Sequence, residues 1–203
     1  MNLLSTIYLA AEDKPSLAVG QKLVPTACPL TVHREENGYG YGTLKNKAQN
    51  YQQMAAAGYP VLLITDLDHA KCPASLLDKW LNTKPHEHFL FRIAVREVEA
   101  WLLADRAAIA DFLKIRVNLV PGNPEQLKDP KRSLLKLASS ASRKIRKGLL
   151  PQPSSKAVIG PEYNNLLTDY VHNRWDIEVA SKHAPSLQRA VVATKVLAAK
   201  FRW

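Results

Sequence analysis

One stretch, residues 61–68, most constrains what this chain can fold into. It reads Val-Leu-Leu-Ile-Thr-Asp-Leu-Asp and follows a Gly-Tyr-Pro turn signal. Four successive apolar residues, β-branched at both ends, predict a strand that is buried on both faces, as in the middle of a parallel sheet. Residues i and i+2 of an extended chain point the same way. Asp66 and Asp68 are therefore expected side by side at the carboxyl end of this strand, where open α/β sheets bind ligands.

This aspartate pair indicates a metal ion. Two like charges a few ångströms apart raise each other's pKa unless a cation lies between them. Mg²⁺, or Mn²⁺ in its place, is the hard oxygen-seeking ion that such a pair suits. The alternative is that one aspartate caps the next helix and the other is solvated.

A second acidic strand end comes early in the chain. Residues 4–11 predict a first strand that ends in Glu12-Asp13. A helix is expected to begin at Pro15 and to stop at Pro25. Glu12 is thus a further candidate ligand, although an acid at this place can also complement the positive end of a helix.

A third acidic site follows the strand expected at residues 89–95. Glu97 and Glu99 lie in a strongly apolar block. If the block is helical they flank its apolar face, and if the strand continues they point the same way. Carboxylates in such surroundings need partners, and a metal or Arg96 would serve. Asp105 is expected to cap the next helix.

The remaining elements define the fold class. A second strand is expected at 30–34, and helices at 44–57, 73–81, 106–113, 131–149, 163–172 and from 185. Alternating strands and helices, followed by helices alone, predict an α/β fold with a mostly parallel sheet flanked by helices. We expect an α/β domain over residues 1–113 and a basic helical extension over 114–203 that packs on it.

Positive charge is concentrated in that extension. The chain has a net charge of +10, and residues 114–156 carry seven Lys and four Arg against two acids, a net of +9. This distribution indicates a polyanionic partner, most often DNA or RNA. In a continuous 131–149 helix, four cations lie within roughly 60° of each other: Arg132, Lys136, Arg143 and Lys147. The alternative is a solvated helix face.

A glycine-rich segment, residues 38–42, precedes the helix expected at residues 44–57. Its glycines would let the backbone approach a phosphate, and Lys45 follows directly. Lys45 is therefore a further candidate for nucleic-acid binding. The segment fits neither standard phosphate-loop pattern, so a plain connecting loop is the simpler interpretation.

Cysteine content and hydropathy indicate a cytoplasmic protein. Cys28 and Cys72 do not form a disulfide framework and are expected to be small core residues. The amino terminus lacks the pattern of a signal peptide, and no apolar run approaches the roughly 20 residues that span a bilayer. No membrane partner is expected, and a homodimer is compatible with these features.

Acids at three strand ends resemble those of the Toprim domain of topoisomerases, primases and overcoming-lysogenization-defect (OLD) nucleases. That family has a Glu after its first strand and an Asp-x-Asp after a later one. The resemblance implies a Toprim/Rossmann-like sheet with Mg²⁺ held by Glu12, Asp66 and Asp68. Two departures favour one metal over two: Asp13 replaces the usual Gly, and Ser16 stands where many nuclease members have an acid.

A closer match covers nearly the whole chain. It looks like an uncharacterised bacterial family of Toprim-like proteins of about this length. The matching stretches are Ala11-Glu12-Asp13 with Ser16, Thr65–Asp68, Arg92–Asp105, Asp129-Pro130-Lys131, Gly160-Pro161-x-Tyr163-Asn164, and Trp175 with Pro185-Ser186-Leu187. Relatives often occur beside ATPases in anti-phage or mobile-element settings, which implies an AAA- or ABC-type ATPase partner.

These features together predict a Mg²⁺-dependent nuclease. Asp66 and Asp68 would hold the metal with Glu97 or Glu99, and Glu12 would ligate it or act as general base. Lys131 or Arg96 would stabilise negative charge on the phosphoryl oxygens. A non-catalytic module that docks on an ATPase is the main alternative. Haloacid dehalogenase-like chemistry is disfavoured because Ala70 stands where a Thr is expected, and no Gly-x-Gly-x-x-Gly supports a dinucleotide site.

Overall fold

A four-stranded parallel sheet forms the centre of the computed structural model, which describes residues 6–27, 30–37 and 40–200. The strands are β1 (Thr6–Ala11), β2 (Thr31–Asn37), β3 (Val61–Asp66) and β4 (Phe89–Ala94), in the spatial order β2-β1-β3-β4. All three strand pairs are parallel. Every residue of β3 is buried, as its apolar run predicts. The predicted α/β class is confirmed.

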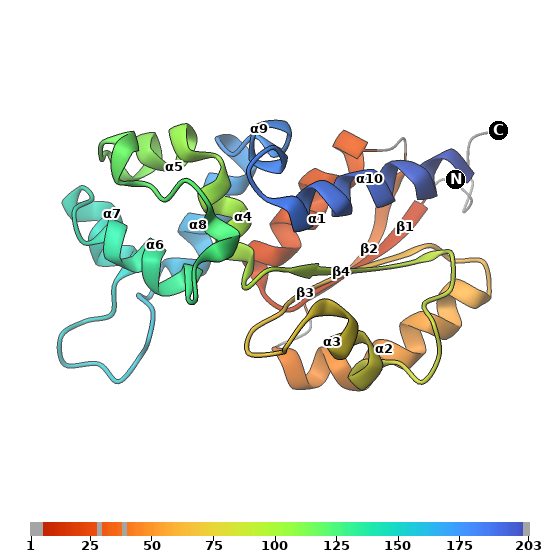
Figure 1. The fold of residues 1–203 in the computed structure, drawn as a ribbon. Helices are drawn as coiled ribbons and strands as arrows, with labels where there is room; N and C mark the ends of the chain where they lie inside the picture. The colour runs from red at the N-terminus through yellow and green to blue at the C-terminus, as the bar shows by residue number, and fades with distance from the viewer. Residues whose placement is uncertain (1–5, 28–29, 38–39, 201–203) are drawn as a thin grey trace.

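Helices cover both faces of the sheet. Figure 1 shows α1 (Lys14–Ala27) and α10 (Pro185–Lys200) on one face, and α2 (Tyr41–Ala56) and α3 (Pro73–Trp80) on the other. Two apolar clusters correspond to these two faces. The first continues from α1 into the C-terminal helices, so the sheet and these helices share one core.

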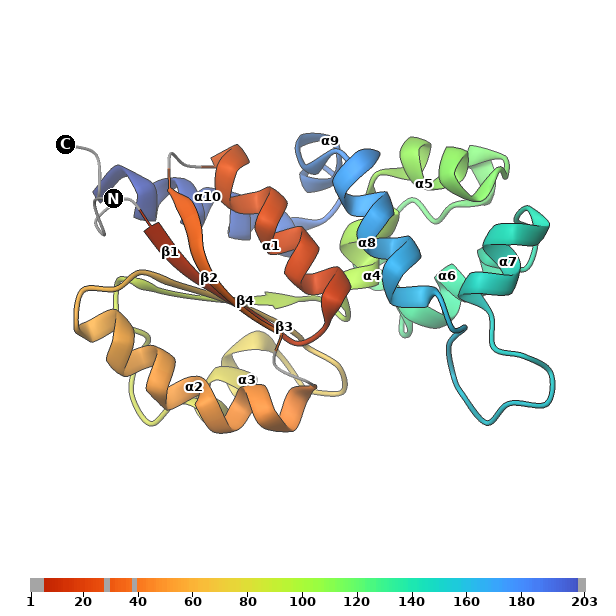
Figure 2. The ribbon, with the colours of Figure 1, turned by 180° about the vertical axis from the view of Figure 1, so that it is seen from behind.

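The C-terminal half adds a helical layer beyond the carboxyl end of the sheet (Figure 2). At its centre is α4 (Val98–Ala104), in which all seven residues are buried. Around it lie α5 (Arg106–Leu113), α6 (Pro130–Ala138), α7 (Arg143–Leu149), α8 (Tyr163–Asn173) and α9 (Ile177–Ser181), with the short turns η2 (Val117–Leu119) and η3 (Pro124–Gln126). Asp105 caps α5 as predicted, because its side chain accepts a hydrogen bond from the Ala108 N–H.

Long-range hydrogen bonds join this layer to α1 and α10, the helices that cover one face of the sheet. The Trp101 indole N–H donates to Ser186 Oγ at 2.7 Å, and Ser186 in turn donates to Glu125 at 2.6 Å. On the other side, the Lys22 ammonium donates to the backbone carbonyls of Val171 and Trp175 at the end of α8. These carbonyls have no intrahelical partner, so a lysine of α1 closes the C-terminus of α8.

Three predictions of local structure are wrong. The predicted 131–149 helix is divided into α6 and α7 because residues 139–142 are non-helical. This segment is rich in serine, and Ser139 Oγ donates to the Lys136 carbonyl, a local bond that competes with helix continuation. Pro25 lies within α1, near its end, where its missing N–H costs only one terminal bond. Cys72 is exposed just before α3, and Cys28 lies outside the described residues.

A projecting loop, residues 151–159, connects α7 and α8 (Figure 1). Its base is closed by a bond from the Gly160 N–H to the Leu149 carbonyl at 2.8 Å. A Cβ atom at Gly160 would meet the Gly148 carbonyl oxygen at 2.2 Å, so no larger residue fits without moving backbone. Among the residues described, no helix has the length and apolarity needed to cross a membrane.

Replacing Gly160 should therefore destabilise the fold. We expect Gly160→Ala to lower the free energy of unfolding by about 1–3 kcal/mol, because the added methyl group overlaps backbone atoms. Urea unfolding followed by circular dichroism measures this change. Gly122→Ala is the control: nothing lies within 4 Å of its Cβ position, and the change there should stay within about 0.5 kcal/mol. Equal effects of the two substitutions would contradict the steric argument.

Candidate functional site

The strand order places two of the predicted acids at the point where the sheet reverses direction. From β1 the chain passes to β2 on one side, and from β2 it crosses back to β3 on the other side of β1. The carboxyl ends of β1 and β3 flank this switch point, where doubly wound sheets bind ligands. Glu12 follows β1 and Asp66 ends β3. Thr65 Oγ donates to Glu12 Oε2 at 2.8 Å, which joins the two strand ends.

Six carboxylates gather at this edge, and we call them the acidic cluster: Glu12, Asp13, Asp66, Asp68, Glu97 and Glu99. Asp66 is 5% exposed, and its Oδ1 accepts a hydrogen bond from the Val98 N–H at 2.8 Å. Burial raises the pKa of Asp66 well above its usual range, and the charges of Glu99, Asp13 and Glu12 add to the effect. Burial likewise raises the pKa of Glu12 and of Glu97.

Asp68 does not lie where the strand pattern predicts. Strand β3 ends at Asp66, and Asp68 has a φ of 47°, so the chain is no longer extended there. The expectation that the chain stays extended through Asp68, on which the shared direction of the two side chains depends, is therefore wrong. Asp68 is partly exposed, and its charge raises the pKa of Glu12 and Glu97. It belongs to the outer part of the acidic cluster.

Glu99 lies at the buried centre of the cluster. It is fully buried in the first turn of α4, and its Oε1 accepts a hydrogen bond from the Tyr163 hydroxyl at 2.7 Å. Lys131 Nζ lies 3.5 Å from the same oxygen. Burial raises the pKa of Glu99 to about 7, and the Lys131 charge works in the opposite direction. Glu99 Oε2 is buried and has no hydrogen-bond partner among the described residues.

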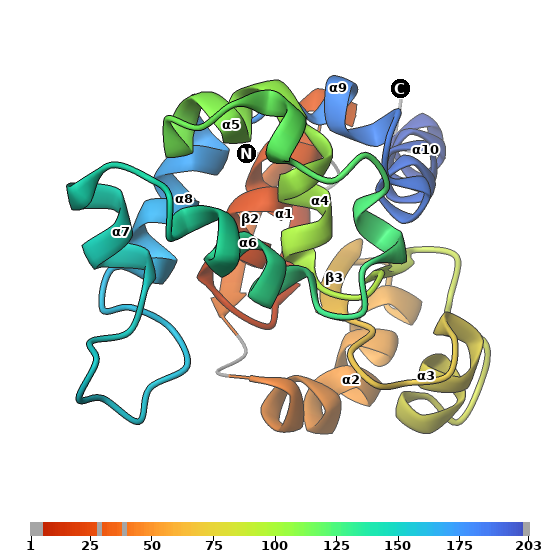
Figure 3. The same cartoon turned by 60° about the vertical axis from the view of Figure 1, so that its left-hand side comes forward.

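Lys131, in the first turn of α6, contacts the acidic cluster through both its side chain and its backbone. Its N–H donates to Glu97 Oε2 at 2.8 Å, while its ammonium approaches Glu99. Burial lowers the pKa of Lys131, but the charges of Glu99, Asp66 and Glu97 together outweigh burial and raise the pKa above its usual value. Its side chain is 30% exposed, so the ammonium group connects the buried carboxylates with the surface. Figure 3 shows α6 next to α4 at this end of the sheet.

Arg96 does not pair with these glutamates, although the sequence made it a candidate partner. Its guanidinium donates to the backbone carbonyls of Asp68 at 3.1 Å and Ala70 at 2.8 Å. Arg96 thus holds the loop after β3, and Lys131 is the cation that contacts the carboxylates. In sequence the two cations are 35 positions apart, and only the fold shows which one reaches Glu99.

Two members of the site were not predicted as site residues. Asp13 raises the pKa of both Asp66 and Glu99, and its Oδ1 accepts the Ser16 N–H at 2.9 Å, which caps α1. The position of Asp13 directly after Glu12 is the sequence feature that could have indicated its place in the site. Tyr163 lies 64 residues from Glu99, and no local pattern connects the two. The signal for Tyr163 was its place in a stretch that matches the suspected relatives.

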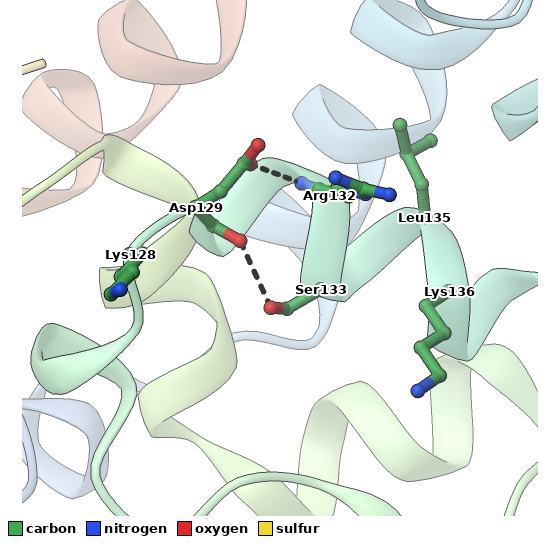
Figure 4. A pocket seen from close by; sticks show the side chains of 6 residues that line it. All are labelled: Lys128, Asp129, Arg132, Ser133, Leu135 and Lys136. Carbon is green, nitrogen blue, oxygen red and sulfur yellow. Dashed lines mark hydrogen bonds between the residues drawn. The ribbon is translucent and has the colours of Figure 1, made fainter.

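A basic groove lies on the solvent side of α6. The groove, a hollow of about 730 Å³, is lined by Lys128, Asp129, Arg132, Ser133, Leu135 and Lys136. Figure 4 shows the three cations around it, with Asp129 capping the helix through the Arg132 N–H at 2.6 Å. Lys128, Arg132 and Lys136 are exposed and have no ion pair among the described residues. Lys128 was not among the predicted nucleic-acid contacts.

The other predicted cations lie on different elements. Arg143 and Lys147 are exposed on α7, so the expected stripe of four cations on one helix is not formed. Lys45 lies one turn into α2, on the opposite face of the sheet from α1 and α10. The Gly40 N–H at the start of α2 donates to the Glu12 carbonyl at 3.1 Å, which places this helix start beside the acidic cluster.

Carboxylates of the acidic cluster accept hydrogen bonds from protein groups and are not arranged around a common point. Within residues 6–27, 30–37 and 40–200, no three acidic, histidine or cysteine side chains surround one point as ready metal ligands. Three of these carboxylates nevertheless keep one oxygen without a described donor: Glu12 Oε1, Asp66 Oδ2 and Glu99 Oε2. Oxygen-only donors with excess negative charge are the chemistry that suits Mg²⁺ or Mn²⁺.

Comparison with known proteins assigns the chain to a family. The domain of unknown function DUF4276 matches residues 15–189, which is most of the sequence. The chain belongs to this family. The matched region includes Asp66, Asp68, Glu97, Glu99 and Lys131, whereas Glu12 and Asp13 precede it. No curated protein and no solved structure matches the chain.

The raised pKa of Glu99 predicts a specific pH dependence of stability. Between about pH 4.5 and 7 the folded protein keeps a proton on Glu99 that the unfolded chain has lost, so the free energy of unfolding falls as pH rises. Glu99→Gln retains the Tyr163 contact and removes this titration. Between about pH 4.5 and 7, the free energy of unfolding of wild type should fall by up to about 3 kcal/mol relative to that of the variant.

Urea titrations at pH 5, 6, 7 and 8 in metal-free buffer measure this difference. Glu178→Gln, at an exposed position of α9, is the control and should keep the wild-type profile. If the free energy of unfolding of wild type, relative to that of Glu99→Gln, stays constant or rises with pH, the raised pKa of Glu99 is contradicted.

Proposed function

We propose that this protein is a Mg²⁺- or Mn²⁺-dependent nuclease that hydrolyses phosphodiester bonds of DNA or RNA in the cytoplasm. The observation that carries the proposal is the acidic cluster at the switch point of the sheet. Six carboxylates gather there, and the partly exposed Lys131 is the cation that lies among them, with charge effects from Glu99, Asp66, Glu97 and Asp13. Concentrating so much negative charge is costly unless a further cation shares it.

The donor set fits such an ion. Glu12 and Asp66 hold the ends of adjacent strands, and each has one carboxylate oxygen that accepts no described hydrogen bond. Asp68 and Glu97 lie close enough to affect the titration of their neighbours and complete the set. When bound there, a divalent ion supplies Lewis-acid polarisation of a phosphodiester oxygen.

The side chains of the protein have separate tasks in this proposal. Glu12, whose pKa is raised by burial, either ligates the ion or takes a proton from the attacking water. The Lys131 ammonium is held by Glu99 and reaches the surface, where it can stabilise negative charge on the phosphoryl group. Arg132 and Lys136, one and five positions further along α6, bind the adjacent backbone phosphates without reading sequence. Arg143, Lys147 and Lys45 extend this contact.

A second candidate is a non-catalytic or conditionally active module that docks on an AAA- or ABC-type ATPase, as the Toprim resemblance implies. One observation favours it: the carboxylates are engaged by Thr65, Val98 and Lys131 rather than arranged around a common point. Under this proposal the partner would rearrange the cluster or supply the nucleic acid. An anti-phage or mobile-element role belongs to either candidate.

Cleavage assays of wild type and of an Asp66 variant should distinguish between the two candidate functions. We expect wild type to cleave plasmid, single-stranded DNA or RNA with Mg²⁺ or Mn²⁺ and to stop when the metal is chelated. Asp66→Asn should reduce the rate at least about 100-fold, because a strand-end ligand is lost. Asp78→Asn, an exposed acid on α3, should cleave like wild type. Equal cleavage by wild type and Asp66→Asn would reject the nuclease proposal, and wild-type activity only with the ATPase would favour the second candidate.

The basic groove should determine how binding depends on salt. Each phosphate contact contributes about one unit to the slope of log affinity against log salt concentration. Replacing Lys128, Arg132 and Lys136 by Ala should therefore weaken binding and lower the slope by about three. Fluorescence anisotropy with a labelled single strand, measured with Ca²⁺ to prevent cleavage, gives both values.

A matched triple variant controls for total charge. Lys71, Lys79 and Lys84 are exposed on or near α3, and none of them lines the groove. Their replacement by Ala removes the same charge but should leave the slope within about one unit of wild type. Identical losses for both triple variants would show that net charge, rather than the groove, governs binding.

A further inference from the structure

Helix α10 is attached to edge strand β4 at both ends. Near its start, Ser186 Oγ accepts the Val95 N–H at 3.3 Å. At its end, the Lys200 ammonium pairs with Glu87, just before β4. The helix therefore runs antiparallel to the strand, on the same face of the sheet as α1 (Figure 1). These two attachments, or ties, set the position of α10 along β4.

Two arginines lie between the ties. Arg92 is three residues before Val95 in β4, and Arg189 is three residues after Ser186 in α10. Arg92 lies roughly 10 Å along the strand from the contact between Val95 and Ser186. Arg189 lies roughly 4.5 Å along the helix from the same contact, in the same direction. Arg92 alternates with Leu90 and Ala94, which belong to the core on the α1 and α10 face.

Neither arginine has an acidic partner in the described part of the chain. Arg92 is largely covered, and its Nε is buried without a hydrogen-bond acceptor. Burial lowers the pKa of Arg92, and the nearby Arg189 charge lowers it further. The acids at the two ties are already engaged, because Glu125 binds Ser186 and Glu87 binds Lys200.

Such a pair needs a counter-charge. Two neighbouring guanidinium groups repel each other, and a covered Nε–H without an acceptor adds a desolvation cost. A tetrahedral oxyanion relieves the repulsion, since it accepts hydrogen bonds from the terminal N–H groups of two arginines at once. The fold holds this arrangement although Glu or Asp could have been placed opposite Arg92.

We propose that Arg92 and Arg189 form a binding site for a phosphate group, either free or carried by a nucleotide or nucleic-acid strand. The site is separate from the acidic cluster, because Arg92 precedes the carboxyl end of β4 and Arg189 contributes from α10. The proposal does not require that the protein cleave anything. The proposed nuclease centre does not use Arg92, although this residue begins the 92–105 block that matches the suspected relatives.

Calorimetry with inorganic phosphate, at constant ionic strength and without metal, tests the site. Wild type should bind phosphate, and Arg189→Met should bind at least tenfold more weakly. Lys195→Met removes an exposed cation from the same helix, roughly 120° further around it, and should bind like wild type. A second titration, with a single-stranded oligonucleotide in place of phosphate, shows whether the phosphate group belongs to a nucleic-acid strand. If it does, the affinity for the oligonucleotide should fall at least about tenfold in Arg189→Met and stay unchanged in Lys195→Met.

Melting temperature in phosphate-free buffer gives a second, independent readout. Arg189→Met should melt higher than wild type, because the repulsion is removed, and phosphate should raise the melting temperature of wild type only. Arg92→Met should lose phosphate binding too, but Arg189 is exposed, so its variant keeps the test valid if Arg92→Met does not fold.

Equal phosphate affinity of wild type and Arg189→Met, or a lower melting temperature of that variant without phosphate, would overturn the proposal. Asp66→Asn should bind phosphate like wild type. Failure of the nuclease proposal and failure of this site are therefore distinguishable.

Discussion

The contact of Lys131 with Glu99 is the interaction on which the arrangement of this protein most depends. Glu99 lies in a helix whose every residue is buried, where an unpaired carboxylate would be costly. Lys131 comes to it from α6 and Tyr163 from α8, so one buried charge joins three helices at the carboxyl edge of the sheet. The same lysine binds Glu97 through its backbone. Helix α6 therefore has one side committed to the acids and leaves Arg132 and Lys136 facing solvent.

This division of charge across one helix connects fold and proposed function. The acidic cluster is internal and close to the sheet, and the cations of the groove are external and free of ion pairs in the described part of the chain. A polyanion on the groove is thus brought next to carboxylates that would repel it unless cations intervene. Under the proposed nuclease function, nucleic-acid binding at the groove and metal binding at the acidic cluster would therefore depend on each other.

Sequence reasoning succeeded where a short local pattern carries the information. The apolar run that ends at Asp66 predicted a central parallel strand, and the alternation of elements predicted the α/β class. It failed where one residue changes the course of the backbone: Asp68 leaves the extended conformation, and serines divide α6 from α7. The pairing of Glu99 with Tyr163 spans 64 residues, so it depends on tertiary packing that no local spacing encodes. The metal and nucleic-acid contacts remain predictions.

The closed base of the 151–159 loop has a consequence for how this fold can vary. Because Gly160 and Leu149 are bonded to each other, the ends of the loop stay together whatever lies between them. Lengthening a loop with fixed ends costs little, about 0.6 kcal/mol for each doubling. The position is thus an insertion point: a peptide tag, or a whole additional domain, can be added there while the helical layer and the sheet keep their geometry.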